Sequence, residues 1–502
     1  MDIVHKQFKQ KYWWHMIRPW KTIFNISFDS EKTIVEEIAS SIREEILKGR
    51  LERGASLPGS RALAKDLGVN RKTVVFAYDA LIADGWLETR YKSGTFVSEH
   101  LPEMKSLSAE KLKDTESNFN VREFVSAPLT EKPFSGNVIF FNEGSPDTRL
   151  APLKELSRAY RRVLDRQGKW GLLGYGDERG DLKLREMLSM FLSRDRGFYA
   201  DPGQICVTKG SQMALYLAAM VLICPGDTVI VENPGYPAVR TLFTEIGAEV
   251  KAIEVDQEGI DIDVLESMCK KEKIKALYVT PHHQFPTTVT MKAGRRIRLL
   301  ELSIKYGFAI IEDDYDHEYH FGAGNNLALS SSEMAINVIY ISSFSKLIAP
   351  AIRVGYITGP QKFMRSLISL RAQIDRQGDN ILEHAIADLM EDGTIGRHSR
   401  KVVSIYRARR DLMAQYLTES LGPMISHHTP VGGLASWIEF NRKIDFNKYM
   451  NNLQKKQVQI VPPGTFYQDG HSRFGMRLGY GSLNDQELKE GIKLLADGIS
   501  KL

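Results

Sequence analysis

The sequence predicts two domains of different class, a small α+β head with the winged helix-turn-helix plan and a larger α/β body with a mainly parallel sheet. Three observations predict this. The chain has 502 residues, more than one hydrophobic core usually serves. Three helical patterns and then two strand patterns occupy the first hundred residues. Beyond residue 138, apolar strand-like runs alternate with helical stretches, which is typical of α/β domains.

The composition is that of an ordinary globular protein, with 43% hydrophobic and 26% charged residues. No apolar run reaches the roughly 18 to 20 residues of a membrane-spanning helix, and the aromatic, basic N-terminus does not read as a signal peptide. We therefore expect a cytoplasmic protein with no membrane partner. Cys206, Cys224 and Cys269 lack the spacing of a zinc site or a disulfide framework, and we expect buried thiols.

The positive charge is concentrated at the start of the chain. The net charge is +5, and residues 1–98 hold 16 Lys and Arg against 12 Asp and Glu, an excess of 4. This asymmetry favours a nucleic-acid-binding head on a nearly neutral body. A solvated basic face is the alternative.

The head begins with a helical repeat of isoleucines that ends at Gly49. A second helix follows with Ser60 as the expected cap and Gly68 as its end, and Asn70 is the expected cap of a third. A polar turn then joins two short strands. The predicted elements are helices over 33–49, 60–67 and 71–84 and strands over 86–89 and 94–97.

In a helix-turn-helix unit the second helix of the pair enters the major groove, and its first residues face base edges and phosphates. Cationic side chains there bind phosphates or guanine, and Asn and Thr hydrogen-bond the backbone. A wing tip approaches the minor groove. A plain three-helix bundle with a basic surface is the alternative. The predicted DNA-binding residues are Arg61, Asn70, Arg71, Lys72, Thr73, Lys92 and Gly94.

The run from Leu57 to Val74, followed by Gly85-Trp86-Leu87 and by Ser93 to Val97, closely resembles the DNA-binding domain of the GntR family. The resemblance covers about residues 31–98. Residues 1–30 form an N-terminal extension outside it. Residues 99–137 are charged and polar without periodicity, so we expect an interdomain linker before a body over 138–502.

The body carries chemistry at the ends of its predicted strands. These strands are expected over 204–208, 228–232, 276–280, 309–313 and 338–342. Ser343-Phe344-Ser345-Lys346 places an amine beside two hydroxyls just after the last of them, and Arg353 follows. Ser343 and Arg353 suit a phosphate group. A lone lysine is otherwise a surface cation.

Further candidates complete the requirements of pyridoxal phosphate, which needs an amine, an acid for its pyridine nitrogen, an anion cradle and a flat partner. Asp313 would pair with the nitrogen, and Tyr315 would bond the ring oxygen. Gly210-Ser211-Gln212 opens a helix and would bind phosphate. Tyr236 would stack on the ring. The alternatives are a metal-binding or solvated acidic loop at 312–316 near His317 and His320, a plain Gly-Ser turn, and a core aromatic; we expect no metal site.

Taken in order, these pieces resemble the fold-type-I aminotransferases, and with the head they resemble the MocR subfamily of GntR-family regulators from about residue 31 onward. The resemblance implies that Lys346 forms the Schiff base with the cofactor. It also implies that Tyr175 reaches the phosphate of a second subunit, hence a homodimer. Arg477 would bind the carboxylate of an amino-acid ligand, and Arg240 would face the same pocket. A surface ion pair is the alternative for both arginines. The motifs that match the subfamily are Tyr175 to Gly180, Gly210 to Gln212, Pro281 to Thr287, Glu312 to Tyr315, Ser343 to Lys346, Arg353 to Tyr356 and Arg477 to Gly479.

Two residues depart from the pattern. Thr288 stands where the family usually has Gly after Gln-Phe-Pro-Thr, and Phe285 stands where the aminotransferases carry an Asn that steadies the ring oxygen. Both departures bear on catalytic geometry beside the ring.

The predicted function is a transcription regulator that binds a double-stranded DNA operator and senses pyridoxal phosphate, or its adduct with an amino acid or amine, through the body. We expect at most vestigial transaminase activity. The alternatives are a working aminotransferase with an accessory head and a body that has lost the cofactor and only dimerises. Fold alone does not separate them.

Overall fold

The computed structural model describes residues 33–101, 122–124, 138–165, 170–322, 327–469 and 475–499. The predicted extension over 1–30 and most of the predicted linker lie outside these residues. The chain divides into two compact units, Met1–Val121 and Arg122–Leu502, and each is described by itself.

The first unit has the predicted winged helix-turn-helix fold. Its elements are α3 (Ile34–Leu47), α4 (Ser60–Leu67), α5 (Arg71–Ala83), β1 (Leu87–Arg90) and β2 (Gly94–Val97). Thr33 and Glu36 form a reciprocal capping box at the start of α3. The two strands pair antiparallel as a wing. One core joins all three helices to the hairpin, and Ile42, Leu63, Val74 and Val97 are fully buried in it.

One cap differs from expectation. Ser60 is the first residue of α4, and the N-cap is Gly59, without a side-chain cap hydrogen bond. Gly68 ends this helix in the left-handed conformation at φ 70°, as expected of a C-terminal glycine.

The second unit is built on a mixed eight-stranded sheet in the order β4-β11-β10-β9-β8-β5-β6-β7. The strands from β10 to β6 in that order run parallel. β11 is antiparallel to both its neighbours, and β7 is antiparallel to β6. The bounds are β4 (Ile205–Thr208), β5 (Thr228–Asn233), β6 (Glu249–Asp256), β7 (Gly259–Ile260), β8 (Ile274–Val279), β9 (Ala309–Asp314), β10 (Val338–Ser343) and β11 (Gly355–Thr358).

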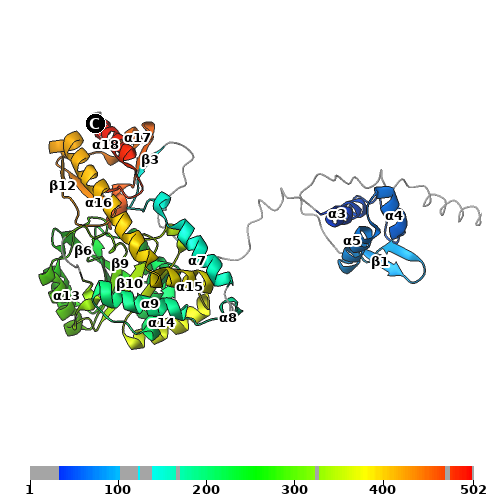
Figure 1. Ribbon diagram of the computed structural model, residues 1–502, viewed down its shortest axis with the longest axis horizontal. Helices are drawn as coiled ribbons and strands as arrows, with labels where there is room; N and C mark the ends of the chain where they lie inside the picture. The colour runs from blue at the N-terminus through cyan, green and yellow to red at the C-terminus, as the bar shows by residue number, and fades with distance from the viewer. Residues whose placement is uncertain are drawn as a thin grey trace, which may run out of the picture. The chain divides into compact units, whose positions relative to one another are not determined.

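Helices cover both faces of this sheet, so most of its strands are buried on both faces. In Figure 1, α13 lies at one side of the strands, and α9, α14 and α15 lie at another. The helices are α7 (Leu153–Asp165), α8 (Trp170–Leu173), α9 (Leu182–Phe191), α10 (Ser211–Leu222), α11 (Pro237–Glu245), α12 (Ile262–Lys271), α13 (Ala293–Tyr306), α14 (Gln361–Ile374) and α15 (Asn380–Glu391).

The long helix α16 (Thr394–Leu421) leads from α15 to a C-terminal lobe, where it packs on α18 (Figure 1). The lobe has its own core around Phe141, Met413, Met476 and Ile492. Its elements are β12 (Ile425–His427), β13 (Ala435–Phe440) and β15 (Gly475–Gly479) in one antiparallel sheet, β14 (Val458–Ile460) paired with β3 (Ile139–Phe141), and helices α17 (Phe446–Lys455) and α18 (Asp485–Ile499).

The structure bears on two expectations for the whole chain, the absence of membrane-spanning helices and the burial of the three cysteines. Within the described residues, helices long and apolar enough to cross a membrane are absent. The expectation of three buried thiols is wrong for Cys224, which is exposed in the loop after α10, whereas Cys206 and Cys269 are buried.

Candidate functional site

The predicted cofactor residues of the body gather at the carboxyl ends of its parallel strands. Asp313 is near the end of β9, and Ser343 is the last residue of the neighbouring strand β10. Ligands of open α/β sheets bind at this edge.

Lys346 is half-buried and does not behave as a surface cation. Its Nζ donates a hydrogen bond to the Gly144 carbonyl at 2.7 Å, across 202 residues of sequence. Its own carbonyl accepts a hydrogen bond from Tyr319 Oη at 2.6 Å. The side chain and the peptide of this lysine are therefore both held in place.

Asp313 has one carboxylate oxygen engaged and one open. Tyr278 Oη donates to Oδ2 at 2.8 Å, while Oδ1 is buried without a hydrogen-bond partner among the described residues. Burial raises the pKa of Asp313 to about 7, although the hydrogen bond from Tyr278 opposes this. A buried carboxylate oxygen without a hydrogen-bond donor, such as Asp313 Oδ1, is energetically unfavourable. A protonated pyridine nitrogen would supply both the missing donor and a compensating positive charge. This side chain therefore fits the predicted cofactor.

The acidic segment around Asp313 is buried, so the alternative of a solvated loop is wrong. Asp314 is 1% exposed and bonds to the buried Arg196. Burial alone would raise the pKa of Asp314, but Arg196, with His282 and His317, holds it well below its usual range. Clusters of three or more His, Cys, Asp or Glu placed to hold a metal are absent from the described part of the chain.

A narrow cradle forms between the start of α10 and β11. A Cβ added to Gly210, whose φ is +80°, would lie 2.7 Å from Arg353 Nη2. A Cβ on Gly355 would lie 2.9 Å from the Ser211 amide nitrogen, and Gly355 pairs with Ser343. Because Gly210 and Gly355 lack side chains, the Arg353 guanidinium, the N-terminus of α10 and the Ser343 hydroxyl can lie close together. A site with these three groups suits a phosphate.

The cradle's polar groups retain donors. Arg353 Nη2 donates to the Lys209 carbonyl at 3.0 Å. No side chain of the described residues caps α10, which begins at Ser211 and continues with the exposed Gln212. Ser343 Oγ accepts from the Ser345 N–H at 2.9 Å. The predicted phosphate residues therefore lie together, with Gln212 on the outer side.

An aromatic wall stands beside this site. Tyr236, the N-cap of α11, meets Phe285 edge to face at 5.2 Å between ring centroids. Burial, with the carboxylates of Glu143 and Asp313 nearby, raises the pKa of Tyr236. Tyr315 also meets Phe285, and its Oη donates to the His283 carbonyl at 2.8 Å. Tyr236 and Tyr315 are thus close to Asp313, as expected of ring partners.

The two arginines predicted for a ligand carboxylate differ in setting. Arg477 is 1% exposed, so the surface ion pair is wrong for it. Its Nε and Nη1 donate to the Glu143 and Pro286 carbonyls at 2.8 and 2.7 Å, and its guanidinium lies 4.7 Å from the Phe285 ring centre. Arg240 is half-buried and donates to the Thr465 carbonyl at 3.2 Å.

Tyr175 lies apart from these groups. It is 80% exposed, and its ring lies 4.2 Å from the Arg376 guanidinium carbon. An exposed tyrosine is available to a second subunit, which is what its predicted role requires.

Thr288 keeps the backbone shape that a glycine favours. Its φ is +64°, a left-handed conformation that is unfavourable for a β-branched residue. Its N–H donates to the Gln284 carbonyl at 2.7 Å, and its hydroxyl lies 3.2 Å from His428 Nε2. The tight turn is therefore formed despite the substitution.

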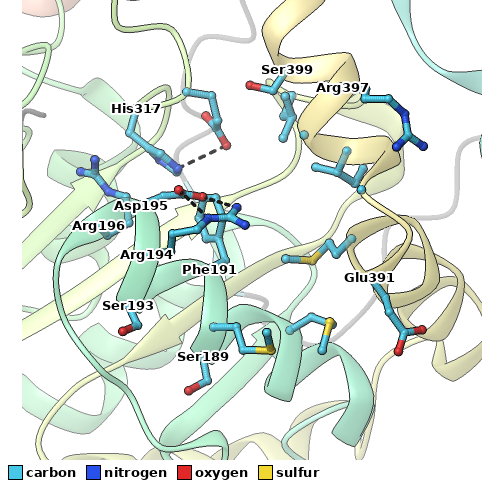
Figure 2. A pocket seen from close by; sticks show the side chains of 18 of the residues that line it. Ser189, Phe191, Ser193, Arg194, Asp195, Arg196, His317, Glu391, Arg397 and Ser399 are labelled. Carbon is cyan, nitrogen blue, oxygen red and sulfur yellow. Dashed lines mark hydrogen bonds and ion pairs between the residues drawn. The ribbon is translucent and has the colours of Figure 1, made fainter. Parts of the chain in front are cut away.

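A separate cavity of about 1250 Å³ is lined mainly by residues of 187–199 and 390–400 (Figure 2). Its wall includes Leu347, which follows Lys346, but none of the predicted cofactor residues. His317 Nε2 lies 3.5 Å from Glu318 Oε1, and Figure 2 shows His317 pointing toward a neighbouring carboxylate. His398, on α16, lies 3.0 Å from the Leu347 carbonyl. The segment that carries Lys346 is thus also contacted by α16.

The head presents its predicted DNA-binding residues at the surface. Asn70 caps α5 by accepting the Lys72 N–H at 2.9 Å, as predicted. Arg61, Arg71 and Lys72 are exposed, and Thr73 is half-buried. Arg71 Nε reaches Ser60 Oγ at 3.4 Å, so the start of α5 contacts the start of α4.

The wing tip has the left-handed backbone of a tight turn. Lys92 has φ +60° and Gly94 has φ +113°, and the Lys92 ammonium lies 5.2 Å from the ring centre of the exposed Tyr91. Both predicted wing residues are therefore exposed, and Lys92 lies beside an aromatic ring.

Sequence reasoning missed three participants in the body. Tyr278 holds Asp313. Gly144 accepts from Lys346. Glu232 is buried beside Asp313 with its pKa raised to about 7 by burial, and accepts from Thr280 Oγ1 at 2.7 Å. Glu232, a carboxylate at the end of an apolar strand, carried a signal in the sequence, whereas Tyr278 reads as an ordinary strand residue. Nothing in the sequence around Gly144 indicates that its carbonyl accepts a hydrogen bond from Lys346.

Comparisons with known proteins agree with the folds of both the head and the body. Residues 137–495 match the family "Aminotransferase class I and II", and residues 34–97 match "Bacterial regulatory proteins, gntR family". The chain is 27% identical to the probable rhizopine catabolism regulatory protein MocR of Rhizobium meliloti, over 94% of this chain and 95% of the relative. It is 29% identical to the HTH-type transcriptional regulator TauR of Rhodobacter capsulatus, over 95% and 98%.

Among solved structures, the body is similar to a kynurenine aminotransferase of Pyrococcus horikoshii, solved in complex with PMP. The identity is 29% and the TM-score 0.69, over 73% of this chain and 92% of the other. The aminotransferase match covers more than half of the chain, and the regulators match it nearly end to end. The chain therefore belongs to the aminotransferase class I and II family and, with its gntR-type head, to the MocR subfamily of transcription regulators.

Proposed function

We propose that this regulator senses pyridoxal phosphate, or its adduct with an amino acid or amine, and converts the signal into altered binding of its heads to a DNA operator. The observation that carries the proposal is the open, buried Oδ1 of Asp313 in the same site as Lys346. When bound, the cofactor would supply a reactive aldehyde and an electron-withdrawing ring.

Each residue of this site has a proposed task. Lys346 attaches the cofactor, Asp313 pairs with its ring nitrogen, and Tyr236 stacks on the ring. Tyr315 bonds the ring oxygen. The phosphate is held by Ser211, Gln212, Ser343 and Arg353, and by Tyr175 of the other subunit of a homodimer.

The ligand and DNA would meet further residues. Arg477, with Arg240 beside the pocket, would bind the carboxylate of an amino-acid effector. Residues 31–98 would be the DNA-binding domain, 99–137 the linker and 138–502 the sensing body. We also propose a cytoplasmic location. The operator would be held by Arg61, Asn70, Arg71, Lys72, Thr73, Lys92 and Gly94.

Titration of pyridoxal phosphate into the full-length, cofactor-depleted protein tests the sensing step. We expect a visible absorbance band that is absent in Lys346→Ala and retained in Lys443→Ala, an exposed lysine of the same body. Operator affinity of the wild type should change with the cofactor, and that of Lys346→Ala should not. If no band forms, the reading of a body that only dimerises is favoured.

A working aminotransferase is the second candidate, because the attachment, ring and phosphate residues all lie in one site. Steady-state transamination assays across amino acids separate the two. Turnover near the median enzyme rate of about 10 per second would favour the enzyme. A stable absorbance band with negligible turnover would favour the sensor.

A further inference from the structure

Phe76 is an aromatic residue on the surface of the recognition helix. It is 61% exposed, whereas Val74, Ala77, Tyr78 and Leu81 of the same helix are buried in the head's core. With about 100° between successive residues, Phe76 lies on the face of α5 opposite that buried stripe. Its ring therefore does not contribute to the core of the head.

The neighbours of Phe76 on that face are predicted DNA contacts. Lys72 is four residues before it and Thr73 is three before it, so both are adjacent on the helix surface. All three lie within the first half of α5. The first six residues of an α-helix span roughly 9 Å along its axis, a length that lies within the roughly 12 Å width of the major groove. A recognition helix that places Lys72 and Thr73 against DNA also places the Phe76 ring there.

The chemistry of the groove identifies what the ring would contact. The thymine C5-methyl group is the apolar feature of the major groove, and aromatic and methyl side chains recognise it. The exposed cations Arg61, Arg71 and Lys72 complement the phosphates and would keep the helix in register. Phe76 has no hydrogen-bonding group for a base edge or a phosphate.

We propose that Phe76 reads the 5-methyl group of one thymine in each half-site of the operator, and so sets part of the sequence specificity. This inference rests on the proposed operator binding and goes beyond it. The thymine methyl group lies against the ring, while Lys72 and Thr73 contact the backbone or neighbouring base edges.

The test starts with a duplex selected from a random-sequence library by the full-length wild type. Each thymine is then replaced singly by deoxyuridine, which removes only the methyl group, and affinity is measured by fluorescence anisotropy. One position per half-site should weaken wild-type binding about fourfold, the factor that matches burial of one methyl-sized group. The same replacement should have no effect on Phe76→Ala.

Three variants serve as controls. Phe124→Ala removes a phenylalanine of the second unit that is 69% exposed, and it should keep the full deoxyuridine response. Lys72→Ala should bind every duplex more weakly, with a salt slope reduced by about one, yet keep the response. Phe76→Leu retains an apolar side chain and should keep a reduced response. The exposed position predicts an unchanged thermal unfolding of the Ala variant.

Specific results would overturn the inference. The wild type could bind its selected duplex with the same affinity after every single deoxyuridine replacement. Alternatively, Phe76→Ala could retain the wild-type pattern, which would mean that the ring packs on another part of the chain or on a second copy. Failure of the wild type to enrich any duplex would instead refute operator binding itself, and the inference with it.

Discussion

Replacing Asp313 by Asn is expected to stabilise the cofactor-depleted protein at neutral pH while weakening its hold on pyridoxal phosphate. In the folded state, burial raises the pKa of Asp313 to about 7, against a usual value of 3.8. The folded protein therefore resists the ionisation that the unfolded chain undergoes readily. Asn carries no charge, so it removes this conflict.

The magnitude follows from linkage between protonation and folding. A raised carboxyl pKa lowers stability progressively as pH increases from the unfolded value to the folded one, and the full loss persists above the folded value. A shift of about three units corresponds to about 4 kcal/mol at about pH 8, and to little below about pH 4. Between about pH 5 and pH 8, the wild type should lose about 3 kcal/mol more than Asp313→Asn.

Urea unfolding of both proteins at the two pH values, followed by circular dichroism, measures the difference. Subtracting one protein from the other removes the pH dependence of buried acids that do not interact with Asp313, such as Glu383, whose pKa burial also raises. Saturating pyridoxal phosphate should reverse the order of stability, because the ring nitrogen pairs with the Asp313 carboxylate.

The adjacent residue provides a matched control with the opposite sign. Asp314→Asn removes the partner of the buried Arg196 and should lower the free energy of unfolding by about 3 to 5 kcal/mol. If Asp313→Asn is destabilising to a similar degree at pH 8, or if its stability follows the wild type at both pH values, the assignment of Asp313 as an unpaired buried acid is wrong.

Three further substitutions test the cradle, the recognition helix and the body. Gly210 has φ +80°, and Gly210→Ala would place a Cβ 2.7 Å from Arg353 Nη2. The dissociation constant of the cofactor, measured by absorbance titration, should therefore rise at least about tenfold. Gly294→Ala, whose Cβ would meet open space, should leave this constant unchanged. Asn70→Ala removes the cap of α5 and should lower head stability by about 1 kcal/mol in thermal unfolding, and an effect no larger than that of the exposed Asp79→Ala would contradict this. Arg409→Ala removes one of the two arginines that pair with the buried Asp147, while Arg149 stays at 2.8 Å, and should cost the body about 1.5 to 3 kcal/mol in urea unfolding. The exposed Arg407→Ala should have little effect.

Much of the architecture was predictable because it depends on local patterns. The cap at Asn70, the helix end at Gly68 and the strand over 94–97 follow from nearest-neighbour chemistry, and the structure has all three. The predicted cap at Ser60 is wrong by one residue, because Ser60 is already the first helical residue and Gly59, with ψ 146°, is the last residue before the helix.

The candidate site was predictable only in its chemically distinctive residues. Lys346, Asp313 and Arg353 stand in recognisable motifs, whereas Gly144 accepts from Lys346 across 202 positions and carries no reactive group. Tyr278 reads as an ordinary apolar strand residue until the fold brings its hydroxyl to Asp313. Such partners are set by tertiary contacts that a linear pattern does not contain.

The same distinction separates attachment from catalysis in the body. Attachment needs the amine of Lys346, the open oxygen of Asp313 and the cradle at Arg353, and these lie together. Rapid turnover also needs the ring oxygen to be steadied, and Phe285 has no donor at the position where aminotransferases carry an Asn.

The environment of Phe285 reinforces this reading. Its ring lies under the Arg477 guanidinium and against Tyr236 and Tyr315, so it forms an apolar wall at that place. Tyr315 donates its hydroxyl to the His283 carbonyl and is the residue predicted to bond the ring oxygen. An attachment lysine without an Asn beside the ring oxygen would favour a slow exchange of ligands. Slow exchange of this kind is what the proposed sensing role would require.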